Sequence, residues 1–81
     1  MLVKLRMFAR LREISGKSEL HVLRPDGSNA GALWNDLIRE YPALAPYTGS
    51  ISCAINQEYA KLSTALQDGD EIAFLPPVSG G

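Results

Sequence analysis

The sequence predicts an α+β fold in which one main helix covers one face of a mixed β-sheet. Three observations favour this class. Several short segments alternate between apolar and polar residues, as half-buried strands do, and one longer segment has apolar residues at helical spacing. The chain has 81 residues, of which 46% are hydrophobic and 21% charged, so we expect one globular domain.

The N-terminal part of the chain predicts a strand, a short helix and a second strand. Residues 2–8 alternate between bulky apolar side chains and mainly charged ones, with Phe8 on the charged face. Residues 9–15 are good helix formers, and Gly16 follows them as a stop. Residues 18–24 alternate again and predict the second strand.

The longest predicted helix spans residues 30–41. Its start can be capped by Ser28 or Asn29, and Pro42 ends it because the residue before a proline avoids helical geometry. Residues 43–50 are expected to form an irregular connector. The apolar side of the helix consists of Leu33, Trp34, Leu37, Ile38 and Tyr41. We expect it to pack on a sheet face made by Val3, Leu5, Leu20, Val22, Ile55, Ile72 and Phe74.

The C-terminal half predicts three more strands. Residues 51–55 alternate, residues 56–58 form a tight turn, and residues 59–62 form a return strand. A second turn at residues 67–70 leads into a last strand at residues 71–75. This order of elements fits a β-grasp (ubiquitin-like) fold, in which the last strand lies parallel to the first in the middle of the sheet.

Composition argues against several classes of function. Lys and Arg total 8 and Asp and Glu total 9, whereas a nucleic-acid-binding protein needs a basic excess. No run approaches the ~18 apolar residues of a membrane span, and the charged start does not resemble a signal peptide. One cysteine and one histidine argue against a disulfide or a zinc site. We therefore expect a cytoplasmic protein with no metal and no nucleic-acid or membrane partner.

No group of side chains in the sequence forms a self-contained active site. His21 lies on a predicted strand and is interpreted as a surface histidine. Cys53 alternates with isoleucines, which is typical of a small core residue. Asp68, Asp70 and Glu71 cluster in a predicted turn and are interpreted as solvated turn carboxylates.

The C-terminal segment is the most unusual feature. The last strand runs directly into Pro76 and Pro77, which cannot continue a β-ladder and favour a stiff, extended backbone. Gly81 would carry a main-chain carboxylate unhindered by neighbouring side chains. We divide the chain into a β-grasp domain, residues 1–75, and an extended tail made of Pro76, Pro77, Val78, Ser79, Gly80 and Gly81. Such an arm suits insertion into a tunnel in another protein.

An apolar patch is expected beside the root of this tail. Phe8 and Leu75 are both predicted to point away from the core, and they become neighbours if the first and last strands pair. Tyr59 and Leu62 would extend the patch. The expected partner interface comprises Phe8, Arg12, Tyr59, Leu62 and Leu75.

Four segments of the chain resemble one protein family. They are residues 8–13 before Gly16, residues 54–57, residues 66–72 and residues 74–81. Together they are similar to the small subunit of molybdopterin synthase, the ubiquitin-like sulfur carrier of molybdenum cofactor biosynthesis. The most specific part is the ending Pro-Pro-Val-Ser-Gly-Gly.

The resemblance implies a carrier subunit that is not an enzyme on its own and binds no cofactor. A ubiquitin-activating-like adenylating enzyme would use ATP to convert the Gly81 carboxylate to an acyl-adenylate, and a sulfur donor protein would then leave a thiocarboxylate there. The large subunit of molybdopterin synthase would receive the tail. The sulfur would pass to a cyclic pterin precursor and build the molybdopterin dithiolene. The resemblance also implies a heterotetramer with two carriers.

Three other functions remain open from the residues alone. The nearest is a thiamine-pathway sulfur carrier, which would share the fold and the Gly-Gly chemistry. Another is a ubiquitin-like protein modifier conjugated through Gly81 to lysines. The third is a plain binding module with an incidental tail.

Overall fold

The structure, a computed structural model, describes residues 1–77 of the chain. The predictions that concern Val78, Ser79, Gly80 and Gly81 lie outside the described residues. The elements in chain order are β1 (Leu2–Met7), α1 (Ala9–Ser15), β2 (Glu19–Leu23), α2 (Ala30–Glu40), the 3-10 helix η1 (Pro42–Tyr47), β3 (Ser52–Ile55), β4 (Glu58–Ala60) and β5 (Glu71–Leu75). No helix among the described residues has the length and apolar character needed to cross a bilayer.

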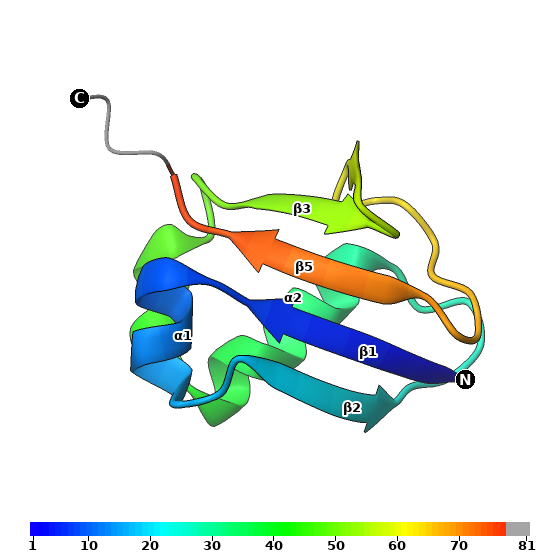
Figure 1. Ribbon diagram of the computed structural model, residues 1–81, viewed down its shortest axis with the longest axis horizontal. Helices are drawn as coiled ribbons and strands as arrows, with labels where there is room; N and C mark the ends of the chain where they lie inside the picture. Colours follow the sequence, from blue (N-terminus) through cyan, green and yellow to red (C-terminus); the bar gives the residue numbers. More distant parts are fainter. Residues whose placement is uncertain (78–81) are drawn as a thin grey trace.

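The strands form one mixed sheet in the order β2-β1-β5-β3-β4 (Figure 1). Strand β5 lies in the middle and runs parallel to β1, while the other neighbouring strands are antiparallel. The α2 helix crosses behind the sheet in the view of Figure 1. This arrangement confirms the predicted β-grasp fold, including the central, parallel position of the last strand.

The core lies between the sheet and the helices. Trp34 and Leu37 of α2 are buried, and the Trp34 ring centroid lies 5.1 Å from that of Phe74 on β5. Ile38 and Tyr41 are only partly buried at the edge of the same cluster. The core also includes six side chains outside the predicted packing surface, namely Met7, Leu11, Ala30, Leu44, Cys53 and Leu66. The predicted contact between the α2 helix and the sheet is therefore confirmed, and side chains of α1 and η1 extend the core.

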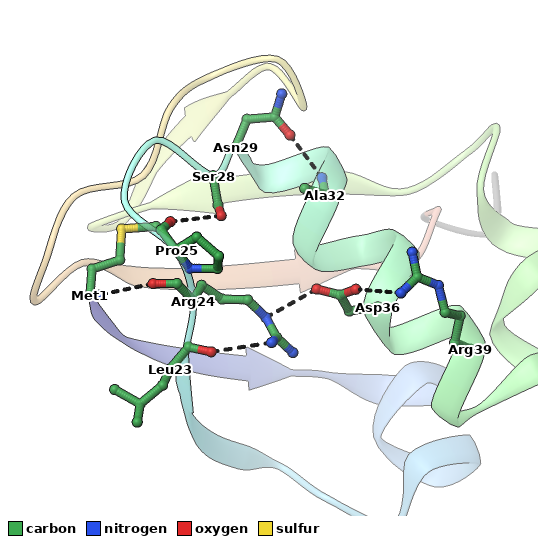
Figure 2. Close-up of polar contacts among 9 residues, drawn as sticks. All are labelled: Met1, Leu23, Arg24, Pro25, Ser28, Asn29, Ala32, Asp36 and Arg39. Carbon is green, nitrogen blue, oxygen red and sulfur yellow. Dashed lines mark hydrogen bonds and ion pairs between the residues drawn. The ribbon is translucent and has the colours of Figure 1, made fainter.

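The ends of the helices follow the expected local chemistry. The side chain of Asn29 caps α2 by accepting a hydrogen bond from the Ala32 N–H at 2.8 Å (Figure 2). Gly16 ends α1 with a positive φ of 73°. Figure 2 also shows the Arg24 guanidinium beside Asp36 of α2, with Nε 3.1 Å from a carboxylate oxygen. This ion pair ties the end of β2 to the main helix.

Two local predictions were wrong in detail. The connector predicted at residues 43–50 contains η1, because Pro42 fits the first position of a helix and Thr48 closes the far end. The Thr48 hydroxyl accepts a hydrogen bond from the Trp34 indole at 3.0 Å, which anchors the connector to the core. The return strand predicted at residues 59–62 is the shorter β4, since Leu62 turns inward to pack beside the start of α2.

Candidate docking face and the root of the C-terminal segment

The open face of the sheet, away from the helices, is charged along part of β1. Lys4 Nζ lies 3.3 Å from a carboxylate oxygen of Glu19 on β2 and 3.8 Å from one of Glu71 on β5. Arg6 reaches the same Glu71 oxygen at 3.8 Å. The hydrogen bond from Lys4 holds the pKa of the Glu19 carboxyl below its usual value. The cations of this region are therefore already paired with acids within the chain.

Beside the charged region, the open face is hollowed. The hollow has a volume of about 250 Å³. Its floor is low because Ala54 on β3 and Ala73 on β5 are direct partners in the strand register and both are small. Tyr59 of β4 pairs with Ala54 on the other side and is 82% exposed. The lining residues are Arg6, Phe8, Ala54, Gln57, Tyr59, Glu71, Ala73 and Leu75.

The structure gathers three of the five residues expected at the partner interface. Phe8, Tyr59 and Leu75 line this one hollow, although they come from three separate parts of the chain. Arg12 is exposed on α1 and does not line the hollow. Leu62 packs against the core, and its carbonyl accepts a hydrogen bond from the first turn of α2. The interface itself stays a prediction, now centred on the three residues that lie together.

Sequence reasoning missed several residues of the hollow. Arg6 stacks its guanidinium over the Phe8 ring, 5.0 Å from the ring centroid. Because the two residues are two positions apart, strand alternation could have indicated that they share a face. The floor at Ala54 and Ala73 has no signal within either strand, because their neighbourhood depends on the register between β3 and β5. Gln57 was assigned to a turn, and its place at the rim follows from the way β4 folds back.

Cys53, the chain's one thiol, is buried in the core, as predicted. Its Sγ donates a hydrogen bond to the Ala60 carbonyl at 3.2 Å. Burial raises the pKa of the Cys53 thiol, which keeps it protonated and weakly nucleophilic. The geometry therefore gives this side chain a packing role in the core.

The other candidate acid–base groups serve the surface and the turns. His21 is exposed and lies 3.5 Å from Glu19, which confirms that it is a surface residue. Asp68 accepts a hydrogen bond from the Leu2 N–H at 2.7 Å, and Asp70 accepts hydrogen bonds from two turns. Within residues 1–77, no three His, Cys, Asp or Glu side chains are grouped so that they could hold a metal ion.

The chain leaves the sheet beside the hollow. Leu75, the last residue of β5, forms part of the rim, while Pro76 is half-buried and Pro77 exposed. Both prolines lie beyond the last paired residue of β5. The last described residues, Pro76 and Pro77, therefore follow directly after a residue of the rim of the hollow.

Comparison with known proteins yields consistent similarities over nearly the whole chain. The ThiS family model matches residues 5–81. The molybdopterin synthase sulfur carrier subunit of Chlamydomonas reinhardtii is 39% identical over 83 aligned positions, which cover 100% of both chains.

Two solved structures share the fold at full length. The solution structure of small archaeal modifier protein 1 from Methanosarcina acetivorans has a TM-score of 0.81 and 36% identity, covering 99% of this chain and 96% of that one. A complex of subunits 1 and 2 of the molybdopterin-converting factor from Helicobacter pylori contains a chain with a TM-score of 0.69 and 28% identity, covering 100% of both chains.

Proposed function

Because this chain belongs to the ThiS family, as one of its molybdopterin synthase sulfur carrier subunits, we propose that Gly81 is the residue that carries the sulfur. The observation that carries this proposal is the similarity to a curated carrier subunit over the full length of both chains. The burial of Cys53 also supports it, because the chain's one side-chain thiol is enclosed in the core. The subunit is a carrier and contributes no catalytic group of its own.

The proposed chemistry explains why a glycine carboxylate needs two partner proteins. A carboxylate is a poor electrophile, so an adenylating enzyme joins it to AMP from ATP and releases pyrophosphate. A persulfide sulfur of a sulfur donor protein then attacks the carbonyl carbon, and AMP leaves. A thiol cleaves the S–S bond of the resulting acyl disulfide, which leaves a thiocarboxylate on Gly81 and the donor sulfur in a disulfide. The thiocarboxylate sulfur attacks a cyclic pterin precursor, and water cleaves the resulting thioester, which returns Gly81 to a carboxylate and leaves the sulfur on the pterin. Two such transfers supply the dithiolene sulfurs. The carrier holds the sulfur in position beside the precursor, so that a bimolecular reaction becomes a reaction within one pre-oriented complex.

The hollow on the open face is the proposed docking site for the large subunit. The complex of subunits 1 and 2 from Helicobacter pylori supports a partner of this kind. The hollow lies where β5 ends, so a protein bound there would stand next to the residues that follow Pro77. In this proposal residues 1–75 form the docking domain and residues 76–81 form the arm that enters the partner. The assembly is a cytoplasmic heterotetramer with two carriers.

Intact-mass spectrometry of the protein isolated from cells tests the proposed function. A sulfur carrier is expected to show a fraction in which one sulfur replaces one oxygen, and fragmentation should place this exchange in the C-terminal peptide. The fraction should disappear in cells that lack the adenylating enzyme. A plain acid in every condition would contradict the proposal.

The docking site gives a separate prediction. Phe8→Ser and Leu75→Ser are each expected to weaken binding of the large subunit by roughly ten- to hundredfold, because each removes about 1.5–3 kcal/mol of apolar burial. The fold should persist: Phe8 is half-buried at the start of α1, where serine is itself a favoured cap, and Leu75 is half-buried at the strand end. Binding titrations and circular dichroism measure the two effects.

Leu23→Ser is the matched control for this pair. Leu23 is 73% exposed on the same open face, but it lies on β2 and outside the hollow. We expect this variant to bind the large subunit with wild-type affinity. If Phe8→Ser and Leu75→Ser bind the large subunit with wild-type affinity, as Leu23→Ser is expected to, the hollow is not part of the interface.

A second candidate function is protein modification, favoured by the 36% identity to the archaeal modifier protein. In this reaction a lysine amine of a target would attack the activated Gly81 carbonyl, and AMP would leave as an isopeptide bond forms. The two functions share the activation step and differ in the nucleophile. The same mass measurement distinguishes them, since a modifier yields lysine-linked conjugates whereas a carrier yields the sulfur-for-oxygen exchange.

A further inference from the structure

The turn between β3 and β4 has an unusual backbone. Its two central residues, Asn56 and Gln57, have positive φ values of 52° and 71°. Positive φ at both positions defines a type I′ hairpin turn, for which Asn-Gly is the preferred pair. Asparagine tolerates this region, but glutamine at the second position is strained where glycine would not be. The presence of Gln57 therefore requires a reason other than turn geometry.

The neighbouring Asn56 has a structural reason for its place. Its amide donates a hydrogen bond to Asp70 at 2.9 Å, and its side-chain oxygen accepts one from the Glu71 N–H at 3.0 Å. Its own N–H donates to the Glu71 carbonyl at 2.7 Å. These contacts join the hairpin to the start of β5, so the side chain of Asn56 is used within the fold.

Gln57 has no comparable contact. Its side chain is exposed, and among residues 1–77 no hydrogen bond of its amide to another group is found. It nevertheless lines the hollow on the docking face. A strained residue that contributes no bond to the fold, and whose side chain stands over a binding surface, is best explained by what it contacts in the complex.

We propose that Gln57 is a recognition residue for the large subunit: its amide hydrogen-bonds the main chain of the partner segment that fills the hollow. This inference rests on the proposed function and adds a specificity determinant to it. The small floor at Ala54 and Ala73 accepts one apolar side chain of the partner. The main chain that carries this side chain would then lie at the rim, within reach of Gln57.

The chemistry of the rim favours an amide in this role. A primary amide both donates and accepts hydrogen bonds, so it complements a main-chain N–H and C=O at the same time. The nearby charged groups of the hollow, Arg6 and Glu71, are 3.8 Å apart and pair with each other. Among the residues that line the hollow, Gln57 is thus the one with a primary amide, and this amide is exposed and available for main-chain recognition.

Gln57→Gly tests the proposal by separating stability from binding. Glycine adopts the positive φ without strain, so the melting temperature is expected to equal or exceed that of the wild type. The Kd for the large subunit is expected to rise about three- to tenfold, the loss of one neutral hydrogen bond. Gln57→Glu is a second variant that keeps the side-chain length and removes the donor, and it should also weaken binding. Thermal melts and binding titrations measure both quantities.

Two other variants distinguish the possible failures. Asn56→Gly, the matched control in the same turn, should lower the melting temperature by about 4–8 °C and leave the Kd unchanged, because its side chain serves the fold. Tyr59→Ser should weaken binding if the hollow is the docking site. Weak binding by Tyr59→Ser with wild-type binding by Gln57→Gly would overturn this inference alone. Wild-type binding by both variants would overturn the docking site proposed above as well.

Discussion

Deletion of Gly81 is expected to abolish sulfur transfer and to leave the melting temperature unchanged. The buried side chains of the described core lie between Val3 and Phe74, and the last strand ends at Leu75. The core therefore does not depend on Gly81. The carboxyl carbon of Gly81 is nevertheless the proposed site of activation and loading. Deletion would move the terminal carboxylate about 3.3 Å back along an extended arm, and a misplacement of ~1 Å can already cost a hundredfold in rate.

Reconstituted synthase assayed for pterin conversion, together with thermal melts, measures this prediction. A variant extended by one residue beyond Gly81 is the complementary test, because it keeps every native residue and buries the acyl carbon inside a peptide bond. Both variants should melt like the wild type and yield no product. Product formation by the deletion variant would contradict the sulfur-carrier mechanism, whereas a lowered melting temperature would contradict the division of the chain at residue 75.

Trp34→Ala is expected to have the largest effect on stability, about 3–5 kcal/mol of the free energy of unfolding. The side chain is 1% exposed, its ring packs against Phe74 in the central strand, and its indole donates to Thr48. The loss therefore combines a cavity in the core with a released connector. For a domain of this size it should lower the melting temperature by more than about 12 °C.

Trp34→Phe separates the two parts of this effect. Phenylalanine keeps most of the apolar volume and loses the hydrogen bond to Thr48, whose hydroxyl still donates to the Ala45 carbonyl at 2.7 Å. We expect a smaller loss, with about 1 kcal/mol from the hydrogen bond. Far-ultraviolet circular dichroism is the suitable probe, since both variants remove the one tryptophan of the chain. Equal melting of Trp34→Ala and the wild type would contradict the core placement.

The elements that sequence predicted well are those whose pattern is local. The alternation of residues 2–8 and the helical spacing of residues 30–41 depend on neighbours along the chain, and β1 and α2 follow them closely. The Asn29 cap and the Gly16 stop are equally local, because each acts on the adjacent helix end. The 3-10 helix η1 was not predicted, because the hydrogen bond that holds it, from the Trp34 indole to the Thr48 hydroxyl, joins residues of two different elements.

The candidate site likewise combines features that the sequence predicted with features that depend on contacts between distant segments. Alternation and helical spacing predicted the β-grasp class, and the four segments that resemble molybdopterin synthase small subunits predicted a carrier, while the residues alone left a thiamine-pathway carrier, a protein modifier and a binding module open. Only the tertiary structure decided which side chains form the docking face. Tyr59 lies at the hollow and Leu62 packs, partly buried, against the core, although both were expected in one patch. The reason is that β4 ends at Ala60 and the chain then turns inward.

The hollow and its rim depend on the register between strands that are distant in sequence. Ala54 and Ala73 become neighbours through the pairing of β3 with β5, and Gln57 reaches the rim through a turn with positive φ. A residue's partners across a sheet are set by long-range packing, whereas its face within a strand is set by alternation alone. The sequence pattern by itself therefore predicted the fold, and a family resemblance predicted a carrier, whereas only the tertiary structure decided which side chains line the hollow.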